Sequence, residues 1–244
     1  MNMKVEAILF DLHHTLTGTR IPPFELLRDT GHELDIQLNR YSDEQLQAAF
    51  QESDSWLRSY LITTNADIHW GNDPSEWLQA DRIMFETLGI NGLADEVILE
   101  FERRWRKAIR GPRYEYFTEE AFETLSKLND RGYTLGICTR RFHNPSHLIK
   151  TSGLEDVFAV VTWSAVPGYA KPNPFTLLDA AAQIAVNPRL CAYVGNLVDA
   201  DIEAAKRGEM IPILTTWADP SEGEKAPEDT IVVGLLLELL EIFN

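Results

Sequence analysis

Short apolar segments alternate with helical segments over the second half of the chain, and this alternation constrains the fold more than any other sequence feature. The first of the helical segments is capped by Thr118 and ended by Gly132. Strands that alternate with helices are typical of parallel βαβ units with right-handed crossovers. We expect strands at 133–138, 158–162, 190–194, 210–214 and 230–233, and a last helix at 235–243.

Another apolar run, residues 5–10, lies near the start of the chain and is followed at once by Asp11. A carboxylate is costly inside a core, so Asp11 is expected where the strand leaves it. Open α/β sheets bind ligands at the carboxyl ends of their strands, which favours a functional role for Asp11. The alternative is a surface Asp that caps a turn.

Between these two regions the periodicity is helical. Residues 17–23 are expected to form a turn, because Gly18 and a Pro22–Pro23 pair break local structure. Ser42 opens a capping box for a long helix, and no strong strand appears before Gly111. The sequence therefore predicts an α/β fold with a doubly wound, mostly parallel sheet. Its core is expected to comprise residues 1–17 and 112–244, with an α-helical domain inserted at 18–111.

Charge and composition disfavour two classes of partner and bear on where the protein is found. The net charge of −16 disfavours nucleic acid or an anionic membrane as a partner. The apolar run at 5–10 is too short for a secretory signal, and the apolar run at 231–237 is too short to span a bilayer. The two cysteines lie in apolar segments, so we expect buried thiols in a reducing compartment and a cytoplasmic protein. The sequence does not indicate an oligomeric state.

Polar residues follow the other predicted strands, and together they suit phosphoryl transfer. Thr139 ends one strand, Asn196 follows another with Asp201 close behind, and Lys171 stands in a proline-bearing loop. In such chemistry an Asp attacks phosphorus, while a hydroxyl and a Lys hold the phosphoryl oxygens. An acidic cluster holds Mg²⁺.

These segments resemble the motifs of the haloacid dehalogenase (HAD) superfamily, in the subfamily with a helical cap after the first strand. The first motif is Asp11-Leu12-His13-His14-Thr15-Leu16, and Thr139 is the second. Lys171 is the third, and Gly195-Asn196 followed by Asp201 is the fourth. The four motifs occur in the family's order and cover essentially the whole chain. The resemblance implies a Rossmann-like core with a cap and a Mg²⁺-dependent phosphatase acting on a small phosphorylated metabolite.

The resemblance also assigns roles to individual residues. It implies catalytic roles for Asp11 as nucleophile, for His13 in proton transfer, and for Thr139 and Lys171. The expected metal ligands are Asp11, the carbonyl of His13, Asn196 and Asp201. We assign substrate binding to Thr15, Arg140, Trp70 and Trp77. For Arg140 the alternative is a solvated arginine, and for the two tryptophans it is packing between cap helices.

Two residues depart from the phosphatase pattern. His13 stands where phosphatases carry their general acid, and Asn196 replaces a metal-binding Asp. An imidazole titrates near neutral pH, and an amide oxygen still binds a hard cation but without charge. We therefore expect a weaker or more conditional Mg²⁺ site. Two alternatives stay open: metal-independent dehalogenation or another non-phosphate substitution by Asp11, and a ligand-binding homologue without turnover.

Overall fold

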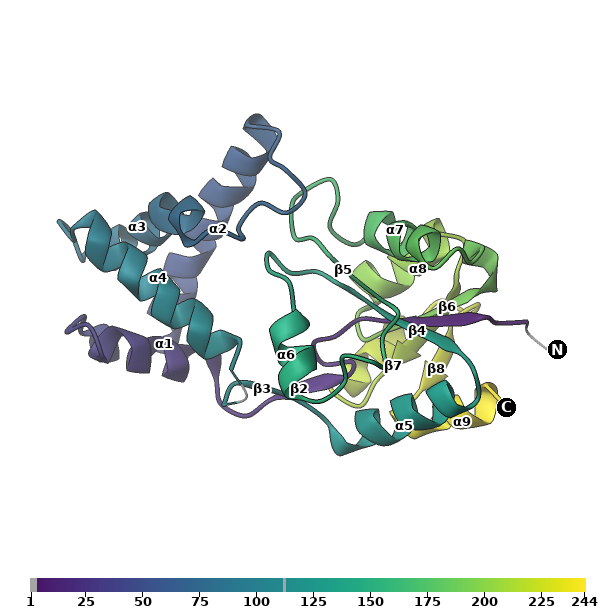
Figure 1. The fold of residues 1–244 in the computed structure, drawn as a ribbon. Coiled ribbons are helices and arrows are strands. Elements are labelled where there is room, and N and C mark those ends of the chain that lie inside the picture. Colours follow the sequence, from purple (N-terminus) through teal and green to yellow (C-terminus); the bar gives the residue numbers. More distant parts are fainter. Residues whose placement is uncertain (1–3, 112) are drawn as a thin grey trace. The chain divides into compact units, whose positions relative to one another are not determined.

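The computed structural model describes residues 4–111 and 113–244, which divide into two compact units. The first unit, the core unit, contains the residues up to Gly18 together with Tyr116–Asn244. The second, the inserted unit, is Thr19–Glu115. Each unit buries apolar side chains of its own (Figure 1).

The core unit contains a six-stranded sheet whose described pairings are all parallel. This sheet confirms the predicted α/β class. Strand β1 lies in the middle, with Ala7 opposite Thr134 on one side and Cys191 on the other. In spatial order the strands are β5 (Val160–Trp163), β4 (Thr134–Thr139), β1 (Ala7–Phe10), β6 (Cys191–Gly195), β7 (Ile211–Thr215) and β8 (Ile231–Val233).

Helices cover both faces of this sheet, as a doubly wound fold requires (Figure 1). Along β1, Ile8 and Phe10 join the apolar cluster of α5 and α9, and Ala7 and Leu9 join that of α7 and α8. All four side chains are fully buried, which explains why β1 is a continuous apolar run. The helices of this unit are α5 (Glu119–Asp130), α6 (Ser146–Thr151), α7 (Phe175–Gln183), α8 (Glu203–Arg207) and α9 (Leu239–Ile242).

The inserted unit is helical, as its periodicity predicts. Ser42 caps α2 through the expected capping box with Gln45. Apolar side chains such as Leu46, Phe85 and Phe101 form the core of this unit. Its α-helices are α1 (Pro23–His32), α2 (Asp43–Thr63), α3 (Leu78–Thr87) and α4 (Asp95–Ile109).

Two expectations about local structure are wrong. The segment expected to be a turn, 17–23, begins with strand β2 (Thr17–Thr19), which pairs with β3 (Glu115–Phe117) in a two-stranded sheet. Strands this short carry no readable alternation and depend on a distant partner. The expected last helix, 235–243, is instead a 3₁₀ turn (Leu236–Glu238) followed by the short α9.

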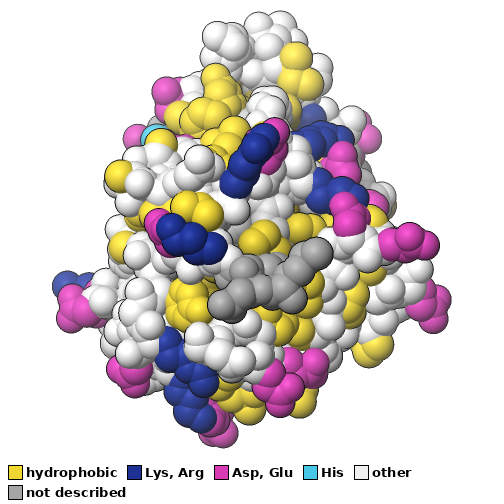
Figure 2. All heavy atoms as spheres, turned by 90° about the vertical axis from the view of Figure 1, so that its right-hand side faces the viewer, with side chains coloured by type: hydrophobic (Ala, Val, Ile, Leu, Met, Phe, Trp, Pro, Cys, Tyr) yellow, Lys and Arg dark blue, Asp and Glu magenta, His cyan; other side chains and the backbone are white. Residues whose placement is uncertain are grey.

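The surface, the helices and the cysteines can be compared with the composition of the sequence. Figure 2 shows a face on which acidic and basic side chains are interspersed among apolar ones. No helix in the described part of the chain is both long and apolar enough to cross a membrane. Cys138 and Cys191 are buried free thiols.

Candidate active site

Asp11 is the first residue after β1, and the neighbouring strand fixes its backbone. Its N–H donates to the carbonyl of Val194 on β6 at 2.8 Å. The residue is 6 % exposed, and its Oδ1 accepts a hydrogen bond from Lys171 Nζ at 2.6 Å. Among the described residues, its Oδ2 has no hydrogen-bond partner. Asp11 therefore has one carboxylate oxygen that is paired with Lys171 and one that is available to a ligand.

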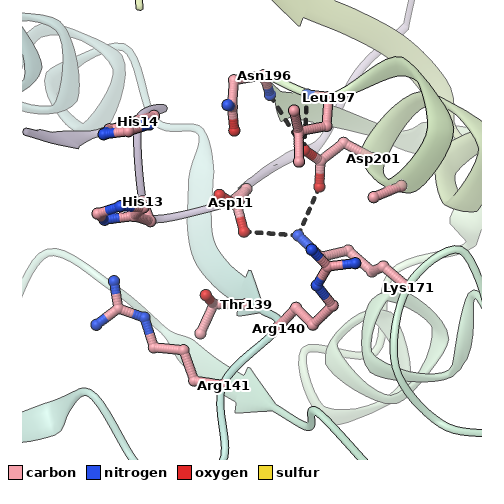
Figure 3. A pocket seen from close by; sticks show the side chains of 11 residues that line it. Asp11, His13, His14, Thr139, Arg140, Arg141, Lys171, Asn196, Leu197 and Asp201 are labelled. Atoms are coloured by element: carbon pink, nitrogen blue, oxygen red, sulfur yellow. Dashed lines mark hydrogen bonds and ion pairs between the residues drawn. The ribbon is translucent and has the colours of Figure 1, made fainter. Parts of the chain in front are cut away.

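The ammonium of Lys171 lies between two carboxylates (Figure 3). Besides Asp11, Nζ donates to Asp201 Oδ1 at 2.5 Å and to Tyr193 Oη at 2.8 Å. Burial by itself lowers the pKa of Lys171, but Asp11 and Asp201 outweigh it and hold the pKa above its ordinary value. Lys171 is therefore a permanent buried cation at this site.

Asp201 is held in place by the loop that follows β6. Its Oδ2 accepts the backbone N–H groups of Asn196 at 3.1 Å and Leu197 at 3.0 Å. A β-carbon on Gly195 would lie 2.2 Å from Cβ of Asp201, so only glycine permits this approach. Burial raises the pKa of Asp201, and Lys171 opposes that rise.

The loop after Asp11 is tied to two other loops. The buried hydroxyl of Thr15 donates to Asn196 Oδ1 at 3.2 Å, and Trp217 Nε1 donates to the carbonyl of Thr15 at 3.0 Å. The rings of His13 and His14 stack with centroids 4.1 Å apart. His14 adopts a left-handed backbone (φ 61°), a conformation that few residues other than glycine adopt readily. Both histidines line the same cavity as Asp11, and Figure 3 shows them on the loop that follows it.

These residues line a cavity of about 200 Å³ in the core unit. The hydroxyl of Thr139 and the guanidinium of Arg140 form no hydrogen bond or ion pair with any described residue. Both are therefore available to an anionic ligand. The predicted site residues in the lining are Asp11, His13, Thr139, Arg140, Lys171, Asn196 and Asp201, and the cavity is completed by His14, Arg141, Leu197 and Ala200.

The other predicted site residues lie elsewhere. Thr15, in the loop after Asp11, is fully buried, and its hydroxyl donates to Asn196. Trp70 and Trp77 belong to the inserted unit, where their ring centroids are 5.2 Å apart. Trp77 Nε1 donates to the carbonyl of Gly71 at 3.0 Å, and Arg106 lies 5.9 Å from the Trp77 ring centroid.

The donor atoms near Asp11 suit a hard cation. The carboxylate of Asp11, the carbonyl of His13 and the side-chain amide of Asn196 all offer oxygen atoms, which Mg²⁺ prefers. Only Asp11 brings a charge to this set, because both carboxylate oxygens of Asp201 already accept hydrogen bonds. Mg²⁺ is commonly held by one or two carboxylates together with substrate phosphate, so this set fits the ion best when a phosphoryl group is present.

Sequence reasoning missed two residues that organise this site. Tyr193 lies inside the predicted strand 190–194, of which it is the one hydroxyl-bearing residue. Burial holds the pKa of Tyr193 well above its ordinary value, so its hydroxyl stays protonated. Trp217 follows β7 and carries no local pattern that points to the Asp11 loop.

Comparison with known proteins gives a family match over most of the chain. A model of the haloacid dehalogenase-like hydrolase family matches residues 5–208. The glyceraldehyde 3-phosphate phosphatase of Methanopyrus kandleri is 32% identical over 114 residues, 46% of this chain and 48% of that protein. This match thus spans about half the length of that relative. The beta-phosphoglucomutase of Bacillus subtilis is 23% identical over 219 residues, 90% of this chain and 87% of that protein.

A solved structure shares the fold across nearly the whole chain. A 2-haloacid dehalogenase from Pseudomonas syringae pv. Tomato DC3000 superposes with a TM-score of 0.71 at 21% identity. The superposition covers 98% of this chain and 97% of that one. At this identity the likeness concerns the fold alone.

Proposed function

Because the chain belongs to the haloacid dehalogenase-like hydrolase family, we propose that it is a Mg²⁺-dependent phosphatase acting on a small phosphorylated metabolite. The single observation that carries this proposal is the state of Asp11. One of its oxygens is paired with Lys171, and the other has no hydrogen-bond partner among the described residues. The hydroxyl of Thr139 and the guanidinium of Arg140, which are also available, line the same cavity. A nucleophile thus lies next to groups suited to a phosphoryl anion.

The proposed reaction has two steps. Asp11 Oδ2 attacks phosphorus, the ester P–O bond breaks, and His13 gives a proton to the departing oxygen. Water then attacks the aspartyl-phosphate, His13 takes a proton from it, and Asp11 and inorganic phosphate are released. Thr139 and Arg140 hold phosphoryl oxygens through both steps, and Lys171 fixes the charge and orientation of Asp11.

The metal is part of the proposal. Asp11, the carbonyl of His13 and Asn196 would hold Mg²⁺, which when bound neutralises phosphoryl charge. Asp201 already accepts hydrogen bonds on both carboxylate oxygens, so we expect it to contribute through Lys171.

The proposed substrate class, the role of the inserted unit and the location of the protein are supported by the relatives, the fold and the cysteines. Both curated relatives carry the names of enzymes that act on small phosphorylated molecules. The inserted unit, with a core of its own, is proposed to be the cap that selects the substrate, with Trp70 and Trp77 as candidate contacts. The two free, buried thiols support a reducing, cytoplasmic location.

A panel of phosphate esters with Mg²⁺ tests the proposal. We expect phosphate release by the wild type, no measurable turnover by Asp11→Asn, and unchanged turnover by Asp156→Asn, which alters an exposed carboxylate of the same unit. Acid quenching during turnover should trap phosphate on the peptide that contains Asp11. Equal activity of wild type and Asp11→Asn would rule out the assigned nucleophile.

Asn196 supports a second candidate reaction, metal-independent dehalogenation. Because Asn196 is uncharged, Asp11 is the only carboxylate among the proposed metal donors, and a reaction without a metal does not need more. In this alternative Asp11 Oδ2 attacks the α-carbon of a 2-haloacid, the carbon–halogen bond breaks, and water hydrolyses the resulting ester. Halide release in the presence of EDTA, without phosphate release from any ester, would favour this reaction over the first.

A further inference from the structure

The ammonium of Lys171 has a third partner besides its two carboxylates. Tyr193 Oη accepts its remaining N–H at 2.8 Å. An ammonium has three N–H groups, so Asp11, Asp201 and Tyr193 together use all of them. The position of Nζ is therefore determined by three contacts from three different segments of the chain.

The hydroxyl of Tyr193 is itself anchored. It donates to the carbonyl of Cys138 at 2.9 Å, and the next residue, Thr139, lines the cavity. Its oxygen also lies 3.3 Å from Asp201 Oδ1. One phenol on β6 thus links the end of β4, the Lys171 loop and the Asp201 loop.

Tyr193 has no route to a substrate. Its side chain is fully buried, and it is absent from the described lining of the cavity. Any effect of its hydroxyl on turnover must act through Lys171, Asp201 or the end of β4. The rest of the side chain packs in the apolar cluster that also contains Leu9 and Met210.

We propose that Tyr193 is a positioning residue, whose hydroxyl holds the Lys171 ammonium against Asp11 so that the free carboxylate oxygen faces the substrate. The proposal rests on the phosphatase function proposed above. In Tyr193→Phe the ring remains, but one ammonium N–H and the carbonyl of Cys138 lose their buried partner. Because the lost contact is to a charged group, we expect kcat to fall by about 10- to 100-fold.

Steady-state kinetics on a phosphate ester test the effect on turnover. In Tyr193→Phe we expect a lower kcat with KM changed by less than about twofold, because the hydroxyl does not touch substrate. Met210→Ala is the matched control, because it removes apolar contacts from the cluster that also contains Tyr193. Met210 directly precedes β7 and so lies away from the carboxyl ends of the strands. We expect this control to lower stability and to leave kcat near the wild-type value. A folded Tyr193→Phe variant with wild-type kcat would overturn the proposal.

A second measurement needs no substrate. In ¹⁵N-lysine-labelled protein, a buried, fully hydrogen-bonded ammonium should give a slowly exchanging signal, assigned by its loss in Lys171→Arg. We expect this signal to shift or disappear in Tyr193→Phe and to persist in Met210→Ala. An unchanged signal in Tyr193→Phe would show that Lys171 does not depend on the hydroxyl. If the wild type hydrolyses no phosphate ester, the proposed function fails, and this signal still decides the role of Tyr193.

Discussion

At the scale of single residues, two side chains of the cavity depart from the pattern of family phosphatases. His13 brings an imidazole to the place where family phosphatases carry an acid, and Asn196 brings an amide to the donor set around Asp11. A protonated imidazole can serve the leaving group and a neutral one can activate water, so a single His suffices for both steps. Compared with the aspartate of family phosphatases, the Asn196 amide still offers an oxygen to a metal ion but carries no negative charge.

Restoring the family residues should therefore change metal dependence and turnover separately. In Asn196→Asp we expect the Mg²⁺ concentration for half-maximal phosphate release to fall roughly tenfold, equivalent to about 1.4 kcal/mol of added affinity. In His13→Asp we expect kcat to change with little effect on that concentration. Magnesium titrations of both single variants and the double variant measure the two effects. An unchanged Mg²⁺ requirement in Asn196→Asp would contradict the assigned donor set.

Residue-scale prediction from sequence succeeded where position follows from local pattern. Asp11 and Thr139 could be placed at strand ends because each lies at the end of an apolar run. Tyr193 and Trp217 could not be assigned to the site. Their contacts with Lys171 and Thr15 depend on the spacing of strands and on loop paths, which local pattern does not encode.

At the scale of elements, the inserted unit contains a buried polar cluster between α3 and α4. Arg106 pairs with Glu102 on its own helix, and its Nη1 donates to the carbonyls of Gly71 and Asn72 at 2.7 and 3.0 Å. Asp81 on α3 lies near this pair, and its Oδ2 is buried without a partner among the described residues. The cluster joins the loop before α3 to α4 but leaves one carboxyl unsatisfied.

Removing that carboxyl should stabilise the protein in a pH-dependent way. Burial, and then the carboxylate of Glu102, hold the pKa of Asp81 well above its ordinary value. Such a group costs no stability below its unfolded-state pKa and costs progressively more as pH rises through its folded-state pKa. In Asp81→Asn we expect a gain of about 1 kcal/mol at pH 8, or roughly 2–4 °C in Tm, and a smaller gain at pH 5.

Thermal unfolding followed by circular dichroism at the two pH values measures this gain. Glu86→Gln is the control, since it removes an exposed carboxylate from the same helix. A gain in Asp81→Asn that is equal at both pH values would contradict burial of the charge as its cause.

At the scale of the whole molecule, the class of the fold was predictable and the connections between its units were not. The strand–helix alternation required a parallel sheet, and the helical periodicity marked the insertion. The ribbon of β2 and β3 carries the chain out of the core unit and back, yet its three-residue strands form only through pairing with each other. Non-local pairing of this kind leaves no local sequence signal.

The two cysteines give a global test of the core unit. Cys138 lies on β4 and Cys191 on β6, and burial raises the pKa of these thiols to about 12 and about 11. Because both values exceed 8, both groups are protonated thiols at pH 8 and should not react with a thiol reagent in the folded protein. We expect both to react once denaturant unfolds the core unit. Rapid labelling under native conditions would show that the sheet opens locally.

The pairing of β1 also determines when this protein can finish folding on the ribosome. Its residues Ala7–Phe10 emerge before their partners, β4 and β6, which are synthesised only after the entire inserted unit has been translated. Until then the apolar residues of β1 lack both neighbouring strands and stay exposed. Exposed apolar segments of this kind are prone to aggregate. The backbone of Asp11 can take its final position only after β6 has been synthesised, because the carbonyl of Val194 accepts its N–H.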